Sequence, residues 1–212
     1  MRILRDALYW TLRAVAWLIL TIGFRLDVSG RGNLPARGAF LLASNHVSYL
    51  DPVALAAACP RRLEFIARED LFRVGWLGWF LRVMGVACDS KEGTFAMRQM
   101  LRALQSGRSV AIFPEGGLQM SGEPGAVAAG ISWLAERAGV PIVPVLVQGT
   151  YQVMPPKTLR LRPGKIRVAF GSPIQYSTER FSGTPTDAVA GAVTDAWRHL
   201  GDEPAGKQKG SS

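Results

Sequence analysis

The chain has 212 residues, of which 48% are hydrophobic and 19% are charged, and its 25 Lys and Arg against 16 Asp and Glu give a formal charge of +9. This composition excludes a disordered chain, because disordered segments are poor in apolar residues and rich in charge. A length near 200 residues predicts one domain with its own core. Positive charge together with a positive mean hydropathy of +0.13 favours a membrane surface over nucleic acid as the partner.

The first predicted element is an apolar helix over residues 7–24, which Arg13 interrupts. The uninterrupted apolar run, 14–24, is shorter than the roughly 20 residues that a spanning helix needs. Trp10 and Trp17 suit a membrane interface, since indole has an apolar body and a polar N–H. We therefore expect a membrane-associated helix that is amphipathic or half-inserted. A core helix, a spanning helix and a signal peptide are the alternatives, although no small-residue cleavage site follows.

After this helix, short apolar runs alternate with helical patterns. The runs predict buried strands at 40–44, 63–67, 85–88, 110–113, 142–148 and 166–170, and the patterns predict helices at 53–58, 71–83, 95–105, 126–138 and 186–200. Such alternation is typical of a single α/β domain with a mixed, largely parallel sheet flanked by helices. We predict the membrane-associated helix within residues 1–27, this domain over 28–201 and a flexible polar tail over 202–212.

Two further segments leave a choice between a structural and a membrane role. Residues 71–86 combine two Trp and two Phe with Arg73 and Arg82. They form either a buried helix whose arginines extend to solvent, or a second element that faces the membrane or lines an acyl chain. Residues 157–167 carry five basic residues and no acid. They form either a contact with anionic lipid head groups or a solvated hairpin edge.

The first candidate site is the polar segment 44–52, which follows a predicted buried strand. Ligands collect at the carboxyl ends of strands in α/β sheets, so the position favours a site. The imidazole of His46 can accept a proton near neutral pH, and Asp51 can hold the other ring N–H. The spacing alone leaves open that Asp51 or Ser48 is simply the N-cap of a helix that begins near Pro52.

The second candidate site is the sequence Phe113-Pro114-Glu115-Gly116-Gly117, which follows another predicted buried strand. Its two glycines allow positive φ angles and close backbone approach, as an anion-binding turn requires. An ordinary β-turn that carries an exposed acid is the alternative.

Competing catalytic motifs are missing from the sequence. It contains no GxSxG nucleophile elbow, no Walker A sequence and no complete dinucleotide-binding loop. Its two cysteines, Cys59 and Cys88, form no CxxC pair, and its two histidines, His46 and His199, cannot form a three-His zinc site. We expect no metal, two reduced thiols in a reducing cytosol, and His199 at a helix terminus.

Five short motifs in order over about residues 28–175 resemble the glycerolipid acyltransferase family, typified by bacterial 1-acylglycerol-3-phosphate acyltransferase. The sequence NHVSYLD at 45–51 resembles the family's NHxSxxD box, and FPEG at 113–116 resembles its FPEG box. Residues 65–75 are similar to its basic-x-acid-Leu segment, 140–145 to its VPIVPV strand and 170–174 to its FGxPI turn.

The resemblance implies transfer of a fatty acyl group from an acyl thioester to the hydroxyl of a lysophospholipid. The first acceptor expected is 1-acyl-glycerol-3-phosphate, which would give phosphatidic acid. His46 would be the general base, and Asp51 would orient the imidazole and stabilise the imidazolium. No cofactor is expected, since acyl-CoA or acyl carrier protein would bring the activated acyl group as co-substrate. The expected location is the cytoplasmic face of the cell membrane, peripheral or monotopic, with lipids and no nucleic acid as partners.

The remaining residues of the motifs are expected to bind substrate: Asn45, Ser48, Arg68, Lys91, Glu115, Gly116 and Gly117. The family usually reads EGTRS, with an arginine that contacts the acceptor phosphate, whereas this chain reads EGGLQ. Lys91 replaces a second family arginine and cannot form a bidentate fork, which leaves Arg68 as the other basic candidate. The alternatives are an acyltransferase for another lyso-lipid, a non-catalytic binder of anionic lipid or nucleic acid on the same fold, and a thioester hydrolase.

Overall fold

The computed structural model describes residues 2–68, 87–89, 93–128, 130–156, 158, 160–175 and 185–203. The helices are α1 (Arg2–Phe24), η1 (Arg31–Asn33), α2 (Asp51–Ala58), α4 (Gly93–Gln105), α5 (Gly130–Ala138), α6 (Thr150–Val153) and α7 (Pro185–Asp202). The strands are β1 (Asp27–Ser29), β2 (Leu41–Ser44), β3 (Leu63–Glu64), β4 (Ile66–Arg68), β5 (Ala87–Asp89), β6 (Ser109–Ile112), β7 (Ile142–Gln148) and β8 (Arg167–Phe170). The segment 71–86 and Lys91 lie outside the described residues.

A six-stranded sheet in the order β1-β8-β7-β2-β6-β3 forms the centre of the domain. Within the described residues β7 and β8 run antiparallel and the other neighbours run parallel. Strand β2 is central: Leu41 pairs with Val110 of β6 on one side and with Ile142 of β7 on the other. Its four residues are all buried, because both faces of the sheet are covered by helices. The predicted α/β domain with a mixed, largely parallel sheet is confirmed.

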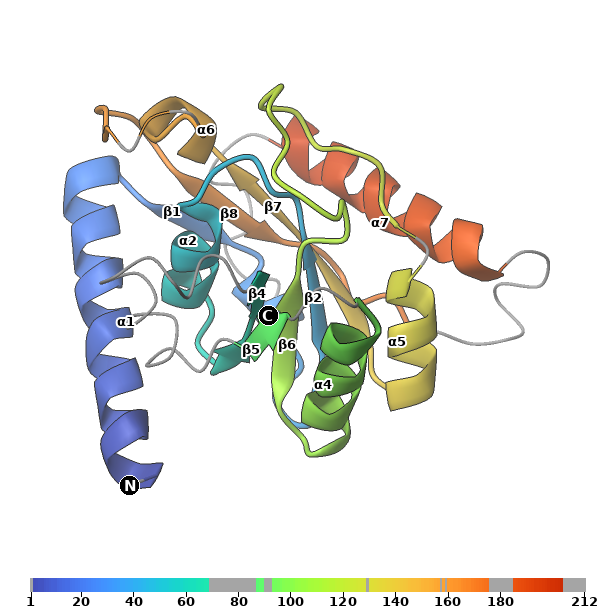
Figure 1. Cartoon of the computed structure of the whole chain (residues 1–212). Coiled ribbons are helices and arrows are strands. Elements are labelled where there is room, and N and C mark those ends of the chain that lie inside the picture. The colour runs from blue at the N-terminus through green and yellow to red at the C-terminus, as the bar shows by residue number, and fades with distance from the viewer. Residues whose placement is uncertain are drawn as a thin grey trace.

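Two hydrophobic layers lie on opposite faces of this sheet (Figure 1). On one face, α1 and α2 pack against alternate side chains such as Leu42 and Val143. On the other face, α4, α5 and α7 pack against Leu41 and Ala43. Successive strand residues point to opposite faces, which is why neighbours in β2 belong to different layers.

The boundaries of several elements differ from those predicted. The run 63–67 is two strands, because β3 pairs with β6 over two residues only and β4 then pairs with β5 in a separate two-stranded sheet. The helix predicted at 126–138 begins at Gly130, since the Ala128 N–H donates to the Pro114 carbonyl and holds the preceding residues in a loop. Strand β1 and the single turn of α6 were not predicted, because neither carries an apolar pattern.

Helix α1 packs along the domain with one side and exposes apolar residues on the other. Tyr9 and Leu20 are buried, although they lie eleven residues, or about 16 Å, apart along the helix. The exposed large apolar side chains on α1 are Trp10, Val15, Trp17, Leu18, Ile19 and Ile22. Residues 6–24 are long and apolar enough to cross a membrane by length and composition, and 17% of that window is buried inside the protein.

Arg13, which interrupts the apolar run, points to the domain. Its Nε donates to the carbonyl oxygens of Ala56 at 3.1 Å and Cys59 at 2.9 Å, at the carboxyl end of α2. A cation is favoured there, because the last carbonyls of a helix are unpaired and carry partial negative charge. The one charge in the middle of the apolar segment therefore fixes α1 to α2.

Candidate active site

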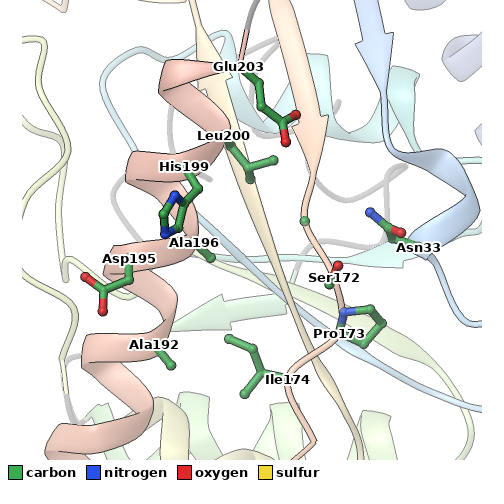
Figure 2. Close-up of a pocket in the computed structure, with 11 residues that line it drawn as sticks. Asn33, Ser172, Pro173, Ile174, Ala192, Asp195, Ala196, His199, Leu200 and Glu203 are labelled. Carbon is green, nitrogen blue, oxygen red and sulfur yellow. The ribbon is translucent and has the colours of Figure 1, made fainter. Parts of the chain in front are cut away.

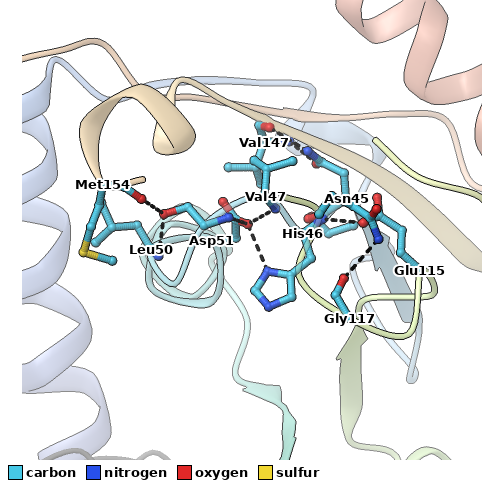
Figure 3. A network of polar contacts seen from close by, with 12 residues as sticks. Asn45, His46, Val47, Leu50, Asp51, Glu115, Gly117, Val147 and Met154 are labelled. Carbon is cyan, nitrogen blue, oxygen red and sulfur yellow. Dashed lines mark hydrogen bonds and ion pairs between the residues drawn. The ribbon is translucent and has the colours of Figure 1, made fainter. Parts of the chain in front are cut away.

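Asp51 is the first residue of α2 and its carboxylate collects three contacts from the loop before it (Figure 3). Asp51 Oδ2 accepts the backbone N–H groups of Val47 at 2.7 Å and Ser48 at 2.8 Å, and lies 3.0 Å from His46 Nδ1. The Asp51 side chain is fully buried. Leu50 is the N-cap of α2 and Asp51 lies in the first turn, so neither Asp51 nor Ser48 is the N-cap.

His46 presents its second ring nitrogen to the surface. Its side chain is 17% exposed and stacks on Phe113, with ring centroids 4.1 Å apart and planes 22° apart. Because Nδ1 faces Asp51, Nε2 is the nitrogen that can take a proton from a ligand. His46 follows β2 and Phe113 follows β6, so the stack forms where two neighbouring parallel strands end.

Asn45 and Ser48 hold the loop between β2 and α2. The Asn45 amide donates to the Val147 carbonyl at 2.9 Å and accepts the Val147 N–H at 2.8 Å, as a neighbouring strand would. The Ser48 hydroxyl donates to the Met154 carbonyl at 2.8 Å and accepts the Leu50 N–H at 3.2 Å. Both side chains are buried, which gives them a positioning role. Their expected contact with substrate stays a prediction.

Glu115 connects the second motif to the first. Its Oε2 accepts the His46 backbone N–H at 3.3 Å and its Oε1 accepts the Gly125 N–H at 3.1 Å. Burial raises the pKa of Glu115, and these two N–H groups offset part of that rise. The Gln119 N–H donates to the His46 carbonyl at 2.7 Å, so the loop after Glu115 holds both sides of the His46 backbone. The interpretation of Glu115 as an exposed acid on an ordinary turn is wrong.

Gly116 and Gly117 form an exposed turn beside this acid. Gly116 has a φ of +74° and its N–H donates to the Phe113 carbonyl at 3.2 Å, a conformation that favours glycine. The positive φ expected from the sequence is thus present at Gly116. Contact between these glycines and a substrate stays a prediction.

Two other residues considered from the sequence, Arg68 and His199, lie on other elements of the fold. Arg68 ends β4, where its backbone pairs with Asp89 of β5. His199 lies in the last turn of α7, as expected, and lines a separate pocket of about 480 Å³ (Figure 2). Its wall includes Ser172 and Ile174 beyond β8, and because β8 runs antiparallel to β7 this pocket is away from the strand ends that carry His46.

Sequence reasoning missed several contributors to the site, among them the Phe113 ring, the Gln119 N–H and the Gly125 N–H. The position of Phe113 directly before Pro-Glu-Gly could have indicated it, whereas backbone donors leave no signal in a sequence. Among the residues that the structure describes, no group of three or more His, Cys, Asp or Glu could hold a metal ion.

Comparison with known proteins identifies the family of this chain. The model of the acyltransferase family matches residues 25–148, which include both the His46 loop and the Glu115 turn. The chain belongs to the acyltransferase family. Its resemblance to this family, first seen in five short motifs, is confirmed.

Relatives of this acyltransferase carry a consistent name. The chain is 26% identical over 183 residues to the 1-acyl-sn-glycerol-3-phosphate acyltransferase of Bacillus subtilis, covering 84% of this chain and 87% of that protein. It is 30% identical over 160 residues to the chloroplastic 1-acyl-sn-glycerol-3-phosphate acyltransferase BAT2 of Brassica napus, covering 73% of this chain. The chain spans 46% of that plant protein and 45% of a similar one from Arabidopsis thaliana, about half their length.

The fold is also that of a solved acyltransferase. The crystal structure of the 1-acyl-sn-glycerophosphate (LPA) acyltransferase PlsC from Thermotoga maritima superposes with a TM-score of 0.80. The match covers 98% of this chain and 83% of that chain at 22% identity, so it supports the fold.

Proposed function

We propose that this acyltransferase moves a fatty acyl group from an acyl thioester to the free hydroxyl of 1-acyl-sn-glycerol-3-phosphate, giving phosphatidic acid. The observation that carries the proposal is the 3.0 Å contact between His46 Nδ1 and the buried Asp51 carboxylate, in a fold and family of acyltransferases. The names of the relatives support this acceptor. The thioester is that of coenzyme A or of acyl carrier protein.

In the proposed reaction His46 Nε2 takes the proton of the acceptor hydroxyl as its oxygen attacks the thioester carbonyl carbon. The new C–O bond forms, the C–S bond breaks, and the leaving thiolate takes the proton back from the imidazolium. The Asp51 carboxylate holds Nδ1–H and stabilises the positive ring. General-base help of this kind contributes roughly 10²–10⁴-fold, and holding both substrates together contributes further. A thioester needs no enzyme nucleophile.

Acyl transfer to 1-acyl-sn-glycerol-3-phosphate, measured with each thioester and the purified chain, tests the proposal. His46→Ala is expected to lose at least about 100-fold in kcat, since it removes the base. The matched control is His199→Ala, which changes a histidine on α7 away from the loop and is expected to keep wild-type activity. Near-wild-type activity of His46→Ala would exclude the mechanism, and free fatty acid as the main product would indicate a hydrolase.

A second acceptor class is favoured by one specific observation. Residues 114–128, the loop that holds His46, contain no Lys or Arg, and the family's phosphate-contacting arginine is missing from EGGLQ. A lyso-lipid without a terminal phosphate is therefore the alternative acceptor. A panel of lyso-lipids that differ only in head group distinguishes the two. In the same panel, Leu118→Arg is expected to raise kcat/KM for the phosphate-bearing acceptor relative to the others.

We further propose that α1 holds the enzyme on the cytoplasmic face of the membrane without spanning it. The buried side of α1 runs from Tyr9 to Leu20, so the helix cannot leave the domain without exposing both. Its outer side offers Trp17 and Ile22 to lipid. Deleting residues 1–26 is expected to abolish co-sedimentation with vesicles, whereas unchanged co-sedimentation would assign membrane binding to another segment.

A further inference from the structure

The loop between α6 and β8 lies beside the carboxyl end of α1. The Ile166 N–H donates to the carbonyl of Phe24, the last residue of α1, at 3.0 Å. Lys165 Nζ lies 3.2 Å from Asp27 Oδ2, just after α1. On its other side the loop is closed by the Arg162 N–H, which donates to the Val153 carbonyl at 2.8 Å. The loop is thus fixed to the end of the apolar helix (Figure 1).

The tip of this loop, residues 160–162, is exposed and has the sequence Arg-Leu-Arg. Leu161 is 57% exposed, and no acid occurs between residues 157 and 175. Basic residues that flank an apolar side chain suit the boundary between lipid head groups and acyl chains, since each part finds its preferred surroundings. A single exposed leucine is common on protein surfaces and does not by itself mark a docking site.

The last turns of α1 carry Ile19, 55% exposed, and Ile22, 75% exposed. The hydrogen bond between the Ile166 N–H and the Phe24 carbonyl joins the loop to the end of α1 that carries these side chains. We propose that the 160–162 tip and the end of α1 form one surface that docks on an anionic lipid bilayer. Leu161 enters the interface while Arg160 and Arg162 contact lipid phosphates. The inference rests on the proposed membrane location of α1 and is independent of the acyl-transfer reaction.

This docking surface gives the enzyme an orientation. The loop follows α6, which itself follows the carboxyl end of β7. His46 and Glu115 lie beyond the carboxyl ends of the parallel strands β2 and β6, so the loop and the site belong to the same end of the sheet. A helix alone could roll about its axis on a membrane, whereas a second contact fixes the angle. Docking through the tip thereby turns the candidate active site toward the bilayer that contains the lysophospholipid acceptor.

The charge contribution is tested by partition of the full chain between water and vesicles. Arg160→Gln with Arg162→Gln is expected to weaken binding to phosphatidylcholine–phosphatidylglycerol vesicles about 30-fold and to leave binding to pure phosphatidylcholine unchanged. The matched control is Arg98→Gln with Arg137→Gln, which removes the same charge from exposed positions on α4 and α5. The proposal would be overturned if both pairs lost the same affinity for anionic vesicles, or if the Arg160 and Arg162 pair lost none. It would also be overturned if the wild type bound nucleic acid more tightly than anionic vesicles.

The apolar contribution is tested by a fluorescent label at Leu161→Cys, in a chain whose two cysteines are replaced by alanine. Anionic vesicles are expected to shift its emission to the blue, and the same label at Trp133→Cys, an exposed position on α5, is expected to stay unchanged. An unshifted label at 161 would refute insertion. Turnover on detergent-dispersed substrates separates this proposal from the reaction. Arg160→Gln with Arg162→Gln is expected to keep wild-type turnover on these substrates. A loss of turnover in this variant would instead place the tip in the candidate active site.

Discussion

Replacing Asp51 by asparagine separates the charge of this side chain from its shape. Oδ2 carries the three contacts to the loop, whereas Oδ1 has no hydrogen-bond partner among the described residues. An asparagine that keeps its oxygen at the Oδ2 position therefore retains the two backbone bonds, and its NH₂ takes the place of Oδ1 without breaking a contact. The substitution removes the negative charge from beside His46 and little else.

The size of the effect follows from the distance. With the closest atoms 3.0 Å apart, the centres of the carboxylate and the imidazolium are roughly 4 Å apart, which at an effective dielectric constant of about 20 corresponds to about 4 kcal/mol. At about 1.4 kcal/mol for each factor of ten, Asp51→Asn is expected to lower kcat about 10³-fold. The KM for the acceptor is expected to change little, because the proposed role of the Asp51 charge is to stabilise the imidazolium that forms during the reaction.

The assay is acyl transfer at saturating thioester and acceptor, with the melting temperature measured on the same preparation. Asp195→Asn, at an exposed aspartate of α7, is the matched control. A fall in kcat of less than about tenfold, with the melting temperature preserved, would refute the assignment of Asp51 as the residue that stabilises the imidazolium.

Three further predictions concern stability. Because the pKa of Glu115 is raised, the folded state binds the Glu115 proton more tightly than the unfolded state does. The resulting contribution to the free energy of unfolding is present below about pH 4.5 and is lost as the pH rises through the folded pKa. The free energy of unfolding of Glu115→Gln, measured as a function of pH, should lack this decline. Arg13→Ala should lower the free energy of unfolding by about 2–3 kcal/mol, because two carbonyls lose a charged donor, whereas Arg137→Ala on exposed α5 should change it little. Gly30→Ala should lower the free energy of unfolding by about 3 kcal/mol or more, since its Cβ would lie 2.0 Å from the Phe170 carbonyl oxygen. Gly38→Ala has a similar φ but open space around the Cβ, and should lower it by about 1–2 kcal/mol. Thermal or denaturant unfolding measures both.

The sequence predicted the parts of the fold that depend on apolar runs. Buried strands such as β2 and β7 have continuous hydrophobic sequences, so their positions and the α/β class were clear. The first residue of α5 was not predicted correctly, because it depends on the hydrogen bond between the Ala128 N–H and the Pro114 carbonyl. This bond joins two separate segments, so the local sequence pattern does not contain it.

The site was predicted unevenly for the same reason. The pairing of His46 with Asp51 was inferred from spacing and family resemblance, and the geometry supports it. The role of Glu115 was not inferred, since its partners are two backbone N–H groups that any residue could supply. Motif reasoning therefore identified the residues, whereas the direction of their side chains required the fold.

Helix α2 links α1 to the His46–Asp51 pair over only eight residues. Asp51 is its first residue, and its carboxyl end receives Arg13 from α1 and Arg31, whose Nε donates to the Ala58 carbonyl at 3.0 Å. Burial and the nearby charge of Arg13 both lower the pKa of Arg31, so the two cations repel and the carbonyls of α2 are what hold them together. Deleting α1 would thus remove the proposed membrane contact and the Arg13 cap of α2 at once. Because Arg13→Ala removes the contacts to the Ala56 and Cys59 carbonyls and leaves the rest of α1 in place, a fall in activity in that variant on detergent-dispersed substrate would measure how far the position of α2 controls His46 and Asp51.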